Sequence, residues 1–123
     1  MKFLLIMHIN PDVLNALTED EQKAIGDGHA AFMETITKSG EMITTQALAD
    51  PSQSAVVRVR NGQTVVTDGP FLEAKEYLGG FYLIDCESRE RAIELAAMIP
   101  DTRVDGLGVE VRQVMFAAGQ LEM

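Results

Sequence analysis

The chain has 123 residues, of which 46% are hydrophobic and 24% are charged, and its formal net charge is −9. This composition predicts a single folded domain over residues 1–123 and excludes an intrinsically disordered chain. The acidic balance argues against nucleic acid and anionic membrane surfaces as partners, because both require clustered Lys and Arg. Cys86 is the only cysteine, so the chain cannot form an internal disulfide. We therefore expect a reducing compartment, the cytoplasm.

The first apolar segment covers residues 2–9 and predicts a buried strand. It is far shorter than the ~20 apolar residues that a membrane span needs. His8 and Asn10 interrupt the run where the apolar part of a secretion signal would continue, and no small-residue cleavage site follows. The segment is therefore interpreted as part of the fold rather than as a signal or an anchor.

A long helix is predicted after this strand. Thr18 and Glu21 have the spacing of a capping box, and Gly40 is a typical stop after a last turn near Ser39. His29 lies on the apolar stripe of this helix. The stripe consists of Ile25, Phe32 and Ile36, with Ala30 and Met33 beside it.

Two glycines, Gly26 and Gly28, lie within this helical pattern. Each costs roughly 1 kcal/mol of helix stability relative to alanine. The cost indicates either close packing of the helix backbone against a neighbouring segment or a local break in the helix, and the sequence leaves both alternatives open.

A β-hairpin is predicted in the middle of the chain. Asn61-Gly62 lies between the strand patterns of residues 54–60 and 63–67, which is a strong signal for a type I′ turn. A two-residue turn places Val57 opposite Val66 on one apolar face. The opposite face then carries Arg58, Arg60, Gln63 and Val65.

The segment after the hairpin begins with Asp68-Gly69-Pro70, which favours a tight turn. Residues 71–77 contain good helix formers and predict one or two helical turns. Gly79-Gly80 then allows the chain to re-enter the sheet without obstruction by side chains. The turn is either a structural corner, in which Asp68 bonds its own backbone, or a place where that carboxylate is held at the edge of a pocket.

The last part of the chain predicts a second helix and a final strand. Ser88 is the expected N-cap of the helix, and Pro100 ends it. The core face of this helix is predicted to be Ala92, Ile93, Ala96 and Ala97. The predicted strands of the whole chain cover residues 2–9, 42–48, 54–60, 63–67, 81–86 and 109–116.

This order of elements predicts an α+β fold of the ferredoxin-like type, with two helices on one face of a mostly antiparallel sheet and an inserted β-hairpin. Such an arrangement leaves the other face of the sheet without a covering layer. We therefore expect a homodimer.

Three segments resemble the DGPF-domain branch of the YCII-related proteins. They are residues 66–71 (VTDGPF), 73–76 (EAKE) and 78–84 (LGGFYLI). The resemblance extends over nearly the whole chain, including His29, Gly40 and the hairpin. It implies a dimeric ferredoxin-like α/β-barrel fold, a bacterial cytoplasmic protein and a largely uncharacterised function. It also implies a regulatory partnership with an extracytoplasmic-function sigma factor as one alternative.

The resemblance also implies a histidine and an aspartate near the dimer cleft. His29 matches the histidine. In some relatives the acidic residue lies directly before the proline that ends the second helix, but here Ile99 has that place and Asp101 follows Pro100. We therefore expect Asp68 to supply the carboxylate. For His29 the alternative is a core histidine bonded to a backbone carbonyl.

Three charged side chains are candidates for binding a ligand. Lys75 can neutralise an anion, Glu73 can line the rim of a pocket, and Arg58 can hold a carboxylate or phosphate through two hydrogen bonds. Each can equally belong to a solvated surface with salt bridges. No zinc-ligand spacing, Walker loop, G-x-G-x-x-G or G-x-S-x-G motif occurs, so we expect no metal and no cofactor.

The sequence therefore supports two hypotheses from different classes. In the first, a cytoplasmic dimer binds a small molecule, an anion being one alternative, in a cleft near His29 and Asp68 and performs acid–base chemistry on it. In the second, the domain is a non-catalytic regulatory module that meets a sigma factor. Whether the protein is an enzyme stays open at this point.

Overall fold

The computed structural model describes residues 1–69 and 76–119. Its helices and strands follow the predicted order, with one short helix and two 3-10 turns in addition. Along the chain they are β1 (Lys2–Ile9), α1 (Pro11–Asn15), α2 (Glu19–Lys38), β2 (Met42–Ala47), η1 (Pro51–Gln53), β3 (Ala55–Arg60), β4 (Gln63–Asp68), β5 (Tyr77–Asp85), α3 (Arg89–Ala97), η2 (Pro100–Arg103) and β6 (Gly108–Gln113).

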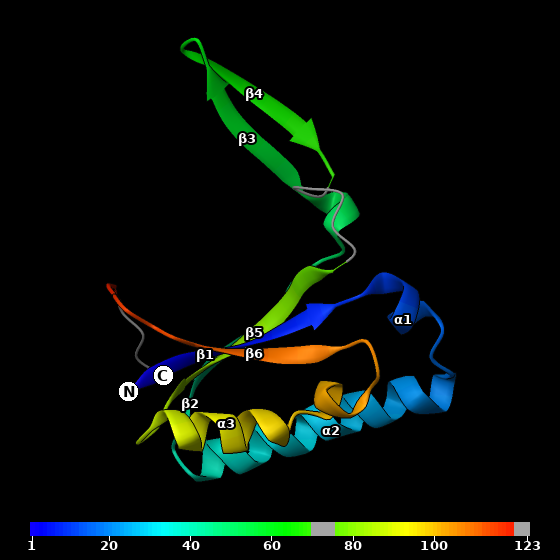
Figure 1. Cartoon of the computed structure of the whole chain (residues 1–123), viewed down its shortest axis with the longest axis vertical. Helices are drawn as coiled ribbons and strands as arrows, with labels where there is room; N and C mark the ends of the chain where they lie inside the picture. Colours follow the sequence, from blue (N-terminus) through cyan, green and yellow to red (C-terminus); the bar gives the residue numbers. More distant parts are fainter. Residues whose placement is uncertain (70–75, 120–123) are drawn as a thin grey trace.

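The main sheet has the strand order β2-β5-β1-β6, and every neighbouring pair is antiparallel. Helices α2 and α3 lie against the same side of this sheet (Figure 1). The result is a mixed α+β structure that is compatible with a ferredoxin-like fold, as predicted. The dimeric barrel form of that fold stays a prediction. No helix among the described residues is long and apolar enough to cross a membrane.

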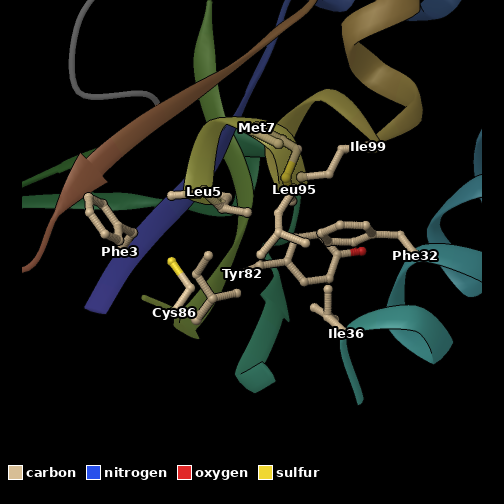
Figure 2. Close-up of a cluster of buried hydrophobic side chains, with 12 residues drawn as sticks. Phe3, Leu5, Met7, Phe32, Ile36, Tyr82, Cys86, Leu95 and Ile99 are labelled. Carbon is tan, nitrogen blue, oxygen red and sulfur yellow. The ribbon is translucent and has the colours of Figure 1, made fainter. Parts of the chain in front are cut away.

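The hydrophobic core lies between the sheet and the helices α2 and α3. Figure 2 shows Tyr82 of β5 surrounded by Phe32 and Ile36 of α2 and by Leu95 of α3. The central strand β1 contributes every second side chain, as expected for a strand that faces helices on one side. These side chains are Phe3, Leu5 and Met7, all buried.

The core face of α3 differs from the predicted one. Ala92 and Ala96 are buried as expected, but Ile93 and Ala97 are exposed and Leu95 is fully buried. The helix is only nine residues long, so a small rotation about its axis exchanges one apolar neighbour for another. As a result Leu95 joins the core cluster that contains Tyr82 (Figure 2).

Helix α2 begins and ends where the sequence predicts. The Thr18 hydroxyl accepts a hydrogen bond from the Glu21 backbone N–H, and the Glu21 carboxylate accepts one from the Thr18 N–H, which completes the capping box. Gly40 has φ +79°, the left-handed conformation that stops a helix. The short helix α1 was not predicted, and its N-cap is Asn10, whose side chain accepts from the Asp12 N–H.

The two glycines within α2 have different surroundings. A Cβ atom at Gly28 would lie 2.8 Å from Cγ of Pro100, whereas a Cβ at Gly26 would have no atom within 4 Å. Close packing is therefore the correct alternative for Gly28. The absence of a side chain there allows η2 to approach the backbone of α2.

The hairpin has the predicted turn and register. Asn61 and Gly62 both have positive φ, as a type I′ turn requires, and Val57 pairs with Val66. Strands β3 and β4 pair only with each other and project away from the main sheet (Figure 1). The helical turns predicted for residues 71–77 fall largely outside the described residues, and Tyr77 is the first residue of β5 rather than part of a helix.

Candidate functional site

A cavity of about 350 Å³ opens at one end of the main sheet. Strands β1, β2 and β5, helix α2 and the turn η2 contribute its walls. Most of the lining is apolar and includes Met7, Ile9, Ile25, Met33 and Leu107. Three titratable side chains also line the cavity, namely His29, Tyr82 and Asp101, and the uncharged polar residues there are Thr45 and Gln46.

These three side chains form one hydrogen-bonded chain. His29 Nδ1 is 2.7 Å from the Tyr82 hydroxyl oxygen, and His29 Nε2 is 2.8 Å from Oδ1 of Asp101. The Asp101 side chain is 4% exposed and that of His29 is 22% exposed. Both ring nitrogens therefore have partners inside the protein, and His29 also lines the cavity.

The positions of the protons on these three side chains follow from Tyr82 and Asp101, the two partners of His29. Burial, with a smaller contribution from the negative charge of Asp101, raises the pKa of Tyr82 to about 12, so the phenol keeps its proton at neutral pH. Its O–H donates to Nδ1 of a neutral imidazole, which then carries its own proton on Nε2. That N–H donates to the Asp101 carboxylate. No buried polar atom of these three side chains lacks a hydrogen-bond partner.

Each member of the chain comes from a different element. His29 lies on α2 three residues before the buried Phe32, so its ring points to the sheet. Tyr82 is a core-facing residue of β5, and its ring stacks on His29 with 5.8 Å between centroids. Asp101 is the second residue of η2, which is held against α2 at Gly28 and anchored by the fully buried Ile99.

Comparison with known proteins agrees with this architecture. The profile of the YCII-related domain matches residues 1–117. The chain belongs to the YCII-related family. An uncharacterized protein of Rhizobium meliloti (strain 1021) is similar to this chain, with 29% identity over 122 residues, which is 98% of each chain. The relationship therefore extends over the whole domain and not only over the loop that follows the hairpin.

In this YCII-related chain the predicted pairing of His29 with Asp68 is not formed. Asp68 is an exposed residue at the end of β4, where it pairs with Ala55 across the hairpin. The next N–H, of Gly69, bonds the Ser54 carbonyl oxygen and so closes the base of the hairpin. The hairpin thus directs Asp68 away from the helix layer, and Asp101 supplies the carboxylate instead.

Of the other predicted ligand-binding residues, the structure describes Arg58, which does not join the cavity. Arg58 is half-buried on β3, in the separate two-stranded sheet, and is not part of the cavity wall. Glu73 and Lys75 lie outside the described residues. Within residues 1–69 and 76–119, no three His, Cys, Asp or Glu side chains are placed to hold a metal ion together.

The sequence analysis did not identify two residues of the site. Tyr82 was not among the candidates there, and Asp101 was set aside because it follows Pro100 instead of preceding the proline. A signal was nevertheless present. Gly28 lies next to His29 in the helix, and an unfavourable glycine there indicates that another segment packs closely at that point.

Proposed function

We propose that this YCII-related protein binds a small, neutral, largely apolar molecule in the cavity beside His29 and exchanges a proton with it. The observation that supports the proposal is the continuous hydrogen-bonded chain from Tyr82 through His29 to Asp101 along the wall of an apolar cavity. A half-buried histidine between a phenol and a carboxylate is typical of a site that moves a proton.

The proposed proton transfer passes through Tyr82, because both nitrogens of His29 already have partners. The Tyr82 oxygen accepts a proton from the bound molecule as its own proton moves to Nδ1. The molecule keeps the electron pair of the broken bond, and the ring becomes an imidazolium. Asp101 stabilises this cation, since its carboxylate accepts from Nε2 in both states. The reverse transfer returns the proton.

The lining of the cavity favours a neutral molecule over an anion. No Lys or Arg is among the described residues of its wall, and the carboxylate of Asp101 lies there. An anion would meet a negative charge without a compensating cation, which is unfavourable in a site of low polarity. The polar part of the molecule can instead bond the Tyr82 hydroxyl or the Gln46 side chain, both on the wall.

Benzamide and benzoate test this proposal as probes of nearly equal shape that differ in charge. Each is titrated into the isotope-labelled protein, and the methyl signals of Met7 and Met33 on the cavity wall are followed by NMR. We expect benzamide, at millimolar concentrations, to move both signals and benzoate to leave them in place. The Tyr82→Phe variant serves as control, because it removes the proposed contact group and should weaken benzamide binding.

Two other outcomes would overturn the proposal. Preferential binding of benzoate would contradict the neutral ligand, and unmoved Met7 and Met33 signals with every probe would contradict a binding cavity.

Proton exchange has its own readout. With a bound carbon acid such as acetophenone in heavy water, we expect deuterium incorporation that depends on Tyr82. Incorporation that is equal in Tyr82→Phe would reject the role of the hydroxyl.

We further infer from the segment Asp68-Gly69-Pro70-Phe71 that the chain belongs to the DGPF branch of the family. The regulatory module with a sigma-factor partner is the alternative that this resemblance implies. A pull-down with a co-encoded sigma factor tests it, and the expected result for a ligand-binding protein is no capture at micromolar concentrations.

A further inference from the structure

A second cavity, of about 290 Å³, lies between helix α2 and the turn η2. We call it the η2 groove. Of the described residues, Ile25 alone lines both this groove and the cavity beside His29. The other apolar residues of the groove are Leu17, Ala24, Pro100 and Val104. Its volume is at the lower limit of the ~300–1,000 Å³ of ligand pockets, so it suits a small molecule.

The η2 groove also contains one acidic and one basic side chain. Glu21 comes from α2 and Arg103 from η2. The hydrogen bond from the Thr18 backbone to Oε1 lowers the pKa of Glu21, so its carboxylate is ionised at neutral pH. Within residues 1–69 and 76–119, Glu21 and Arg103 form no ion pair with each other or with another side chain. Oε2 and the guanidinium are therefore both open to a ligand.

The turn η2 takes part in both cavities. Residues three apart in a 3-10 helix lie on the same side, so Pro100 and Arg103 both face the groove. Asp101, between them, lines the other cavity and accepts from His29. The turn packs directly on α2, with Pro100 at Gly28 (Figure 1). A molecule that contacts η2 in the groove therefore acts on the element that positions Asp101.

We propose that the η2 groove is a regulatory site for a free α-amino acid with an apolar side chain. The carboxylate of the amino acid bonds the Arg103 guanidinium, and its ammonium group bonds Oε2 of Glu21. Its side chain packs on the apolar lining of the groove. A simple anion would leave Glu21 without a partner and meet a like charge, and a simple cation would do the same at Arg103.

The proposed regulation follows from the two contacts. An amino acid that bonds both Glu21 and Arg103 ties η2 to α2 and so holds Asp101 at His29. The Tyr82 hydroxyl then keeps its place in the hydrogen-bonded chain, which should strengthen binding in the neighbouring cavity. Occupation of the groove is independent of the proposed function, whereas this regulatory effect rests on it. The coupling is reciprocal, so a molecule in the cavity must strengthen binding in the groove by the same factor.

Leucine and two analogues that each lack one charged group test the binding. These are 4-methylpentanoate, without the ammonium, and 3-methylbutylamine, without the carboxylate. The methyl signals of Leu17 and Val104 are followed by NMR in the isotope-labelled protein. We expect leucine to move both signals at millimolar concentrations, and each analogue to bind roughly tenfold more weakly or less. Unmoved signals with leucine, or equal affinities of the three probes, would overturn the proposal.

Charge-removing variants identify the contact groups. Arg103→Gln and Glu21→Gln should each weaken leucine binding roughly tenfold. Glutamine at residue 21 still completes the capping box, so the helix start is preserved. The control is Arg89→Gln, because Arg89 is exposed on α3 and is not part of the groove. Equal leucine affinity in Arg103→Gln and Arg89→Gln would overturn the proposal.

The coupling is measured with benzamide through the Met7 and Met33 signals. We expect saturating leucine to lower the dissociation constant of benzamide about fivefold, and saturating benzamide to do the same for leucine. Arg103→Gln should abolish the effect at the same leucine concentration. Bound leucine without any effect on benzamide would reject the regulation.

A complete lack of benzamide binding would contradict the proposed function but not the η2 groove. The nitrogen-15 signals of the His29 ring then decide, because they should still move as leucine is added. Unmoved ring signals with leucine bound would overturn the regulatory role.

Discussion

At the scale of single residues, the partners of His29 decide what its ring can do. Tyr82 and Asp101 each occupy one nitrogen, so the imidazole does not act on a bound molecule directly. The ring connects the buried phenol of Tyr82 to the buried carboxylate of Asp101, and it can accept one further proton. The chemistry of the site thus depends on three side chains. Of these, only His29 was identified as a candidate from the sequence.

The tautomer of His29 provides the first prediction. When the ring of the wild type is neutral, we expect its proton on Nε2, because Asp101 accepts from that nitrogen and Tyr82 donates to the other. Asp101→Asn should shift this distribution, since an amide can present a donor to Nε2. Nitrogen-15 shifts of the ring at constant pH measure the change. Asp68→Asn is the matched control, and a change in that variant instead would contradict the structure.

The alkaline titration of Tyr82 is the second prediction. Its pKa is raised from 10.0 to about 12, first by burial and then by Asp101. The native state therefore holds this proton more tightly than the unfolded chain. The stabilising effect is complete below pH 10 and is lost as pH rises through about 12. We expect the free energy of unfolding to fall over this range, and less so in Tyr82→Phe.

In Asp101→Asn the phenolate absorbance of Tyr82 should appear at lower pH than in the wild type. The shift should be partial, because burial remains and is the larger cause. An unchanged titration would show that Asp101 does not act on this hydroxyl, and would remove the electrostatic connection between the two ends of the chain.

At the scale of elements, the contact between α2 and η2 sets the position of the carboxylate. Pro100 packs on the backbone of α2 at Gly28, and Asp101 follows it directly. The five-membered ring is stiff, so it transmits any displacement at this contact to the next residue. The separation of His29 and Asp101 therefore depends on a glycine that makes no hydrogen bond to either.

Gly28→Ala is the third prediction. Its methyl group would lie 2.8 Å from Pro100, so η2 must move away from α2. We expect a net loss of about 1–2 kcal/mol in the free energy of unfolding, because overpacking exceeds the gain in helix propensity. Gly26→Ala is the control without a neighbouring atom and should stabilise the helix by up to about 1 kcal/mol.

Denaturant unfolding measures both variants, and the nitrogen-15 spectrum of His29 reports the site. Only Gly28→Ala should change that spectrum. If both alanines stabilise the protein equally, the contact between Gly28 and Pro100 is not tight in solution.

At the scale of the whole molecule, the chain consists of a well-packed helix-and-sheet body and a hairpin outside it. The buried core residues come from β1, α2, β5 and α3, together with Cys86 after β5 and Ile99 after α3. The hairpin contributes none of them. A two-stranded hairpin is only marginally stable by itself, and the homodimer expected from the sequence would offer it a surface to pack on.

Unfolding that depends on protein concentration is the fourth prediction. If folding and association are linked, dilution favours the unfolded state by mass action. We expect the denaturant midpoint of the wild type to rise with protein concentration. A midpoint that is independent of concentration would indicate a stable monomer and contradict the expected homodimer.

Local signals allowed much of the fold to be predicted. The capping box of Thr18 and Glu21 and the turn at Asn61-Gly62 depend on residues only a few positions apart, and both formed as expected. Apolar periodicity predicted the strands of the sheet to within a few residues. It failed on the face of α3, where Ile93 and Leu95 compete within a short helix and packing against Tyr82 decides.

The sequence by itself determined where the helices and strands lie, the register of the hairpin and the presence of His29 on an inward face. These features arise from short-range bonds and from side-chain periodicity, which can be read along the chain. Only the tertiary structure decided the partners of His29. Tyr82 is 53 residues away and Asp101 is 72, and no local pattern records which distant groups meet. Asp68 was the more conspicuous carboxylate in the sequence, but the packing of Pro100 on Gly28 brought Asp101 to the ring.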